Sequence, residues 1–382
     1  MAIQAGGFGT RIFFLPNQGA TVVASQILKG SGYATINVKG AHYSSTGNLW
    51  QQIFGGNDTV TLSTQIDYMQ GSTTITSSSI EETRQISVGH PYYFDSGRLI
   101  ANMLPTDCES IGMTITISAV KNDNLSGALA ILNSGELQST LSLAPPAVSS
   151  AVSIAGIVKK LLTNTDPQNS LQGHYDGKVS VAASTDPIRD YCLTQGTLIL
   201  VYRESDNDTS LDDLDPTQFT TDGDGLKYAG AAMQNTYVMF QISFDQTRGP
   251  IANSAWSTMF TTADSSLLAV LGAANDADKQ KLWTAAFAMY QQAVVLLEAD
   301  AELTSLEKLG IAALQLTTLK KAYTDNGGTF TAPLVEKLPD AKLPTLTLNN
   351  LDSITKSYTQ RLALSRRSLP GGRLKAIVEP GE

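Results

Sequence analysis

The sequence predicts an α+β protein, with an antiparallel β-sandwich-like N-terminal region, further strands in the middle and a C-terminal α-helical hairpin. Short segments in the first part alternate hydroxyl and apolar residues and are separated by Gly, Pro and Asn. From Ser254 onward, apolar residues recur at helical spacing instead. No strand–helix–strand rhythm precedes this change, so separate β and α regions are expected.

Five segments in the first third have the composition of strands, because they are rich in β-branched and aromatic residues. They are residues 11–15, 20–28, 33–38, 59–68 and 113–120. Residues 59–68 alternate hydroxyl and apolar side chains, as a strand with one buried face should. Short strands divided by turns are typical of an antiparallel sandwich. We therefore expect a β-sandwich-like domain over residues 1–123.

The middle of the chain, residues 124–250, predicts a mixed α/β region. Helical patterns cover residues 125–143 and 147–162. Further strands are expected at residues 178–182, 197–202 and 236–244. The uninterrupted apolar run 198–201 indicates a strand that is buried on both faces. These strands either complete the first sheet or form a second β domain.

The apolar pattern of residues 251–328 predicts a helical hairpin domain. Asn275 is suited to an N-cap, and the sequence Thr-Ser-Leu-Glu at 304–307 matches a capping box. Each helix carries an apolar stripe, formed by Leu282, Ala286, Met289, Ala293 and Leu297 in the first and by Leu306, Leu309, Ala313, Leu316 and Leu319 in the second. Asn326, Gly327 and Gly328 are expected to end the second helix. A short acidic turn between the helices indicates an antiparallel pair.

Residues 329–382 predict a linker, one more helix and a basic tail. Pro333, Pro339 and Pro344 impose an extended linker. An amphipathic helix is expected at about residues 348–364, followed by a short tail that is rich in Gly and Pro.

Composition limits the classes of function. The chain has 382 residues, of which 42% are hydrophobic and only 16% charged, so it can bury a core but has a surface dominated by hydroxyls and amides. The net charge of −9 argues against a general nucleic-acid binder, because phosphate affinity comes mainly from Lys and Arg. Cys108 and Cys192 are too few for a disulfide scaffold, and two buried thiols in a reducing compartment are favoured.

The N-terminal residues lack a basic segment followed by a long apolar segment, so no secretory signal is expected. The longest uncharged run, residues 137–158, contains Pro145 and Pro146 and several serines, which favours a buried helix over a membrane span. The expected location is the cytoplasm, or the exterior by a route that needs no N-terminal signal.

Sequence motifs for catalysis are weak. His42, His90 and His174 are not at the helical spacing of a zinc site, and no cysteine pair is closely spaced. A nucleophile built from Cys108 or Cys192 and a distant histidine is formally allowed, but any chain with both residue types allows it. The glycine-rich segments match no nucleotide-binding fingerprint. No cofactor is expected, and the balance leans away from an enzyme.

An acidic segment follows residue 203, with no basic residue up to residue 224. Oxygen-rich loops of this kind can hold Ca²⁺. The weak candidate ligands are Asp206, Asp208, Asp212, Asp213 and Asp215. Their spacing fails the EF-hand pattern, since the glycine is missing, and a solvated loop is the favoured alternative.

Basic residues collect near the C-terminus without an intervening acid. The candidate interaction residues are Arg361, Arg366, Arg367, Arg373 and Lys375. Such a tail suits phosphate, an anionic lipid surface or the carboxylates of a protein. If it bound the acidic segment of a second copy, the contact would build rings or filaments. The favoured alternative is two separate solvated features, or pairing within one chain.

Together these patterns predict a non-enzymatic structural or protein-interaction component, part of a homo- or hetero-oligomeric assembly and prone to self-association. The alternatives are an enzyme of unrecognised family, whose dispersed residues would leave little trace in the sequence, and a membrane-active effector that uses residues 137–158 and the basic tail.

Overall fold

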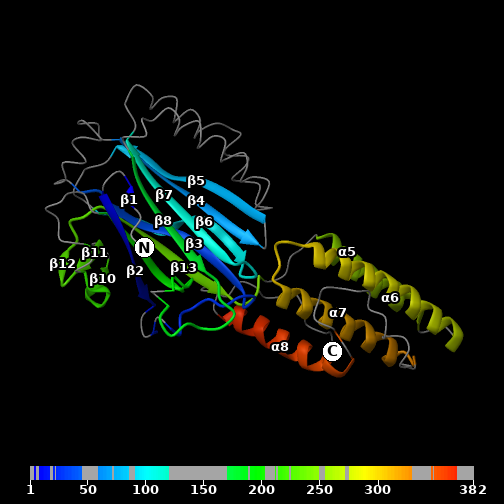
Figure 1. Cartoon of the computed structure of the whole chain (residues 1–382). Coiled ribbons are helices and arrows are strands. Elements are labelled where there is room, and N and C mark those ends of the chain that lie inside the picture. The colour runs from blue at the N-terminus through cyan, green and yellow to red at the C-terminus, as the bar shows by residue number, and fades with distance from the viewer. Residues whose placement is uncertain are drawn as a thin grey trace. The chain divides into compact units, whose positions relative to one another are not determined.

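The computed structural model describes residues 4–5, 8–17, 20–21, 23–44, 59–70, 73–85, 91–119, 170–187, 190–202, 211, 214–222, 225–248, 254–271, 275–328, 346 and 348–367. The chain forms two compact units, one of Met1–Lys29 with Ala34–Phe244 and one of Gly30–Tyr33 with Asp245–Glu382 (Figure 1). The predicted helices at 125–143 and 147–162 and the Pro-rich linker lie outside the described residues. The division of the sequence into four regions stays a prediction.

The first unit contains two large sheets and one small sheet (Figure 1). The six-stranded sheet has the order β1 (Gln4–Ala5), β2 (Phe8–Pro16), β9 (Gly196–Tyr202), β13 (Tyr237–Asp245), β3 (Tyr33–His42) and β6 (Pro91–Pro105). The four-stranded sheet has the order β5 (Thr73–Gln85), β4 (Thr59–Gln70), β7 (Ser110–Ala119) and β8 (Ser170–Lys178). The small sheet consists of β10 (Phe219–Asp222), β11 (Gly225–Tyr228) and β12 (Ala231–Ala232). Strands from the middle of the sequence therefore belong to both large sheets.

The main core of the first unit contains side chains from both large sheets. Alternate residues of β4 and β7, such as Leu62, Ile66 and Ile115, are buried in the same cluster as Ile36 of β3 and Leu200 of β9. This packing follows from the period of two along a strand, which places every second side chain on one face. The antiparallel, sandwich-like N-terminal region is confirmed.

Strand β9 is central and buried on both faces, as its apolar run predicts. It pairs with β2 on one side and with β13 on the other. Leu198 and Leu200 belong to the core between the large sheets. Ile199 and Val201 belong to a second cluster that includes Phe219 of the small sheet. The small sheet therefore covers the outer face of the six-stranded sheet.

Some strand predictions differ from the structure. Residues 20–28 were expected to be a strand, but residues 23–25 form a turn and only Gln26 makes a bridge, to Thr194. The predicted strand at 178–182 is also wrong, since β8 ends at Lys178. Strands β5 and β8 went unpredicted because they are rich in Ser, Thr, Gln and Gly and carry little apolar alternation.

The second unit contains four described helices: α5 (Ala255–Leu271), α6 (Asp276–Ala299), α7 (Ser305–Asp325) and α8 (Leu348–Arg367). Its core is aromatic. The ring of Trp283 stacks on Phe287 and contacts Tyr323, while the hydroxyl of Tyr290 on α6 donates to the carbonyl of Ala312 on α7 at 2.9 Å. The predicted helical hairpin is confirmed.

The apolar stripe predicted on α6 is displaced, whereas on α7 Leu309, Ala313, Leu316 and Leu319 are buried as predicted. Ala286, Ala293 and Leu297 are buried, but Leu282 and Met289 are only half-buried, and Leu306 is exposed. The reason is size, because the larger aromatic side chains at the adjoining positions of α6 occupy the core, namely Trp283, Phe287 and Tyr290.

The helix boundaries follow the predicted caps. The side chain of Asn275 accepts a hydrogen bond from the amide of Asp278 at 2.9 Å. Helix α7 ends at Asp325, and Gly327 has a φ of +79°, a left-handed conformation that glycine adopts without steric cost.

Candidate interaction surface

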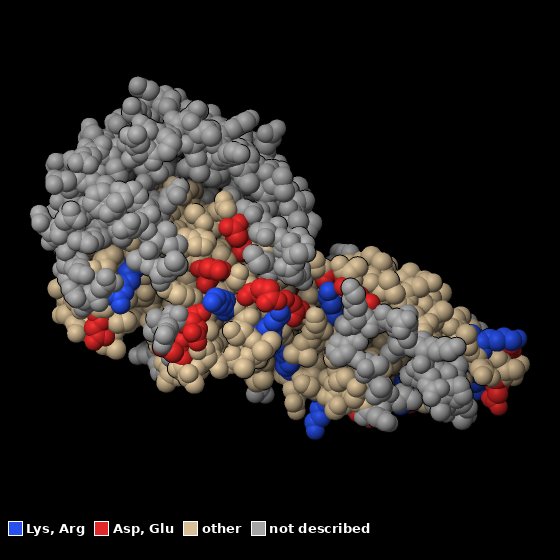
Figure 2. Space-filling view, in the orientation of Figure 1, with Lys and Arg blue, Asp and Glu red and all other residues tan. Residues whose placement is uncertain are grey.

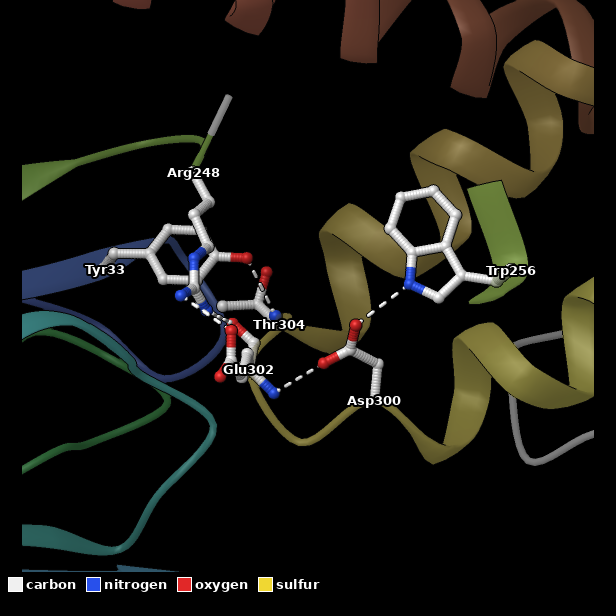
Figure 3. A network of polar contacts seen from close by, with 6 residues as sticks. All are labelled: Tyr33, Arg248, Trp256, Asp300, Glu302 and Thr304. Carbon is white, nitrogen blue, oxygen red and sulfur yellow. Dashed lines mark hydrogen bonds and ion pairs between the residues drawn. The ribbon is translucent and has the colours of Figure 1, made fainter. Parts of the chain in front are cut away.

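A polar network surrounds the turn between α6 and α7 (Figure 3). Asp300, which caps the end of α6, accepts hydrogen bonds from Nε1 of Trp256 and from the amide of Glu302, both at 2.9 Å. The guanidinium of Arg248 forms an ion pair with the Glu302 carboxylate at 2.7 Å and donates to the Glu302 carbonyl at 2.9 Å. The turn therefore holds the start of α5 and the segment that precedes it.

The capping box at the start of α7 is only half formed. The hydroxyl of Thr304 accepts from the amide of Glu307 at 3.2 Å, as predicted. In the reciprocal half, the amide of Thr304 donates to the hydroxyl of Tyr33 at 3.0 Å and not to Glu307. The Glu307 side chain accepts instead from the amide of Arg248 at 3.0 Å and from the hydroxyl of Tyr358 at 3.4 Å.

Glu307 is a buried carboxylate with an exposed fraction of 0%. Burial raises its pKa above the ordinary value, while hydrogen bonds from Tyr33, Tyr358 and the amide of Arg248 and the charge of Arg361 act in the opposite direction. The carboxylate is thus surrounded by donors from three segments of the second unit, those of Tyr33, Arg248 and Tyr358. This arrangement fits a structural role, because these donors satisfy the buried carboxylate within the chain.

Arg361, one of the predicted interaction residues, bonds within its own chain. Its guanidinium donates to the carbonyls of Ser31 at 2.8 Å and Gln246 at 2.6 Å. Arg366 and Arg367 belong to α8 by their backbone, but their side chains lie outside the described residues. Arg373 and Lys375 lie wholly outside them. A role of Arg361 and of these four residues in binding a partner stays a prediction.

The solvent-facing side of α5 and α6 carries no charge over most of its length. Among the side chains of α5 that the structure describes, the exposed ones are those of Ala255, Thr258, Thr261, Thr262, Ser265 and Leu268. Those of α6 after its charged first turns are Thr284, Ala285, Ala288, Gln292, Val295, Leu296 and Ala299. We call these two sets the α5–α6 face. Figure 2 shows this part of the second unit as mostly uncharged along its middle, with charged atoms at both ends.

Large apolar side chains of the α5–α6 face are well exposed. Leu268 has an exposed fraction of 57%, Val295 of 53% and Leu296 of 40%. The single charged residue of α5, Asp264, is half-buried, and burial raises its pKa to about 6. Depletion of charge together with exposed apolar groups is the pattern of surfaces that contact other proteins.

The two helices that bear the face are firmly held together. The ring of Phe260 contacts Tyr290 with centroids 5.5 Å apart, and the Ser266 hydroxyl lies 3.9 Å from the sulfur of Met289. With the Trp256–Asp300 bond at the other end, these contacts fix which side of each helix is exposed.

The acidic segment is described only in part. Asp206, Asp208, Asp212 and Asp213 lie outside the described residues. Asp215 is exposed and caps a short 3-10 helix, η3 (Pro216–Gln218), by accepting from the amide and hydroxyl of Thr217 at 2.9 and 2.8 Å. These bonds lower its pKa. In the described part of the chain, no three His, Cys, Asp or Glu side chains are grouped to hold a metal ion. The Ca²⁺ site stays a prediction.

The residues considered for nucleophilic catalysis have structural surroundings. Cys108 and Cys192 are free, buried thiols, and burial raises the pKa of Cys108 to about 12, which keeps it protonated. His42 is buried, with Nδ1 2.9 Å from the carbonyl of Asn235 and its ring stacked on Tyr237. His174 is exposed and lies 3.1 Å from the Thr114 hydroxyl. His90 lies outside the described residues.

Sequence reasoning missed the residues that organise the second unit. Arg248, Asp300 and Tyr358 belong to no motif, and their partners are far away in sequence. The lack of charge in α5 was the available signal for the α5–α6 face. Of the helices that the structure describes, none combines the length and the apolar character needed to cross a membrane.

No protein-family model matches the chain, and a comparison with curated proteins finds no match.

Proposed function

We propose that the protein is a non-enzymatic structural or protein-interaction component that assembles with further copies of itself through the α5–α6 face. The observation that carries the proposal is the scarcity of charge on α6 from Thr284 to Ala299, where the one charged residue, Glu298, is half-buried, beside a helix whose one charged residue is also half-buried. An exposed face that remains uncharged over several helical turns lowers the cost of removing it from water.

A second copy is the partner that the charges favour. The chain has a net charge of −9, so most approaches of two copies bring like charges together. The α5–α6 face avoids this repulsion because it has no charge to repel its counterpart. A pair related by a two-fold axis would place Val295 and Leu296 of each copy against the same face of the other.

Free buried thiols at Cys108 and Cys192 support the expected cytoplasmic location, because disulfides are rare in reducing compartments. Export by a route without an N-terminal signal remains the alternative compartment in this proposal.

Substitutions that introduce negative charge on the α5–α6 face test the proposal. In sedimentation velocity, the unmodified protein should form a defined oligomer, and Val295→Asp with Leu268→Asp should shift it to the monomer. Thr318→Asp, on an exposed position of α7, is the matched control and should leave the oligomer intact. An unmodified protein that stays monomeric, or an oligomer that survives both substitutions on the face, would contradict the proposal.

A further inference from the structure

The ring of Tyr358 on α8 is seated against the backbone of Gly310 on α7. A methyl group added at position 310 would overlap the Tyr358 ring. Gly310 is the only glycine within the four described helices. Glycine inside a helix costs about 1 kcal/mol relative to alanine. Glycine is present at position 310 despite this cost because any larger residue would collide with the Tyr358 ring.

Few of the side chains of α8 that the structure describes are buried and apolar. Among its side chains that the structure describes, Leu351 and Tyr358 are the buried apolar ones, whereas α6 buries an extended series of aromatic and aliphatic residues. Polar bonds contribute the rest of the attachment. Thr355 and Thr317 lie 3.0 Å apart through their hydroxyls, and Tyr358 donates to Glu307 at 3.4 Å. Arg361 donates to the carbonyls of Ser31 and Gln246.

The described attachment of α8 therefore runs along one side of the helix from Leu351 to Arg361 and includes Tyr358. Segments that bury little apolar surface open with a smaller free energy than the core of the same unit. The other three helices share an aromatic core to which these contacts of α8 do not belong, since Trp283, Tyr290 and Tyr323 contact residues of α5, α6 and α7. Opening of α8 needs no loss of these contacts.

We propose that α8 is a releasable strap, a helix that detaches from α7 while the rest of the unit stays folded. Two contacts, which we call the catch, hold it closed: the packing of the Tyr358 ring on Gly310 and the hydrogen bond from Tyr358 to Glu307. When the strap is released, it uncovers a row of small residues on α7 at helical spacing, Gly310, Ala313 and Thr317. It also exposes the Glu307 carboxylate to water. Release of α8 therefore converts a covered face of α7 into a solvent-exposed one. This proposal does not depend on the proposed function.

Hydrogen exchange followed by mass spectrometry on the full chain tests the strap. In the unmodified protein, amides of α8 should exchange through a separate opening that is more frequent than that of α6 and α7. Gly310→Ala should speed exchange in α8 by about tenfold or more, because an overpacked contact is lost from the closed state. The same substitution favours the helical state of α7 itself, so α7 should not open more often.

Two further variants make the result decisive. Tyr358→Phe keeps the ring and removes the bond to Glu307, and it should speed α8 exchange by about two- to tenfold. Ser357→Ala, at an exposed position of α8, is the control and should leave exchange in α8 nearly unchanged. If Gly310→Ala prevents folding, Tyr358→Phe alone provides the test. Exchange of α8 together with α6 and α7 in a single opening, or exchange unaffected by loss of the catch, would overturn the proposal.

Discussion

The indole Nε1 of Trp256, in the first turn of α5, donates a hydrogen bond of 2.9 Å to the carboxylate of Asp300 at the end of α6. Because the two residues lie at opposite ends of the α5–α6 segment, their bond closes the pair of helices. The pair then presents a constant set of side chains to solvent, including Leu268 and Val295.

The first prediction concerns this bond. Asp300→Ala should lower the free energy of unfolding by about 1–3 kcal/mol, because the buried indole of Trp256 is left without its acceptor. Chemical denaturation monitored by tryptophan fluorescence measures the change. Asp352→Ala, at an exposed position of α8, is the control, and an equal effect of both substitutions would contradict the assigned role.

The second prediction concerns Asp264, whose pKa is raised to about 6 by burial. Since the folded state holds this proton more tightly than the unfolded state, the contribution of Asp264 to stability is full below pH 4 and is lost as the pH rises through 6. Asp264→Asn should therefore raise the free energy of unfolding at pH 7 by about 1 kcal/mol, after allowance for solvent screening. Denaturation of both proteins at pH 4.5 and 7.5 measures the difference in the free energy of unfolding. A stabilisation by Asp264→Asn at pH 4.5 alone would refute the prediction.

The third prediction concerns Glu307. Its pKa is raised, so the folded protein should gain stability from this group as the pH falls from neutral toward the ordinary carboxyl range. Glu307→Gln should remove that gain and keep an acceptor for the Arg248 amide. Glu307→Ala removes every acceptor and should cost about 2–4 kcal/mol. Denaturation of the three proteins across pH separates the effects, and a larger loss in the Gln than in the Ala variant would be inconsistent with this account.

The fourth prediction concerns the thiols. Burial and a pKa of about 12 should make Cys108 unreactive toward a thiol reagent in the native protein at pH 8. Cys192 is also buried, and burial raises its pKa. Both thiols should titrate once the chain is unfolded without reductant. Rapid native labelling of Cys108, or fewer than two thiols in the unfolded chain, would contradict it.

The sequence predicted those parts of the fold that depend on local patterns. The apolar run of β9 identified a central strand, and the caps at Asn275 and Thr304 located two helix starts. Polar strands such as β5 were missed, because their position follows from pairing with β4 and not from their own composition.

The polar network could not be predicted for a related reason. Glu307 matches a capping box in sequence, yet its partners Arg248 and Tyr358 are brought to it by tertiary packing. Arg361 was selected for its charge alone, which gave no sign that its guanidinium donates to the carbonyls of Ser31 and Gln246. The local sequence pattern predicts the helix face on which a residue lies, but its hydrogen-bond partners depend on tertiary packing.

Sedimentation velocity of the unmodified protein at low and high salt tests the central claim most directly. An uncharged α5–α6 face predicts a defined oligomer that persists, or grows more stable, as salt screens the repulsion between chains of net charge −9. A particle that remains single at every concentration, or an oligomer that dissociates as salt increases, would contradict assembly through this face.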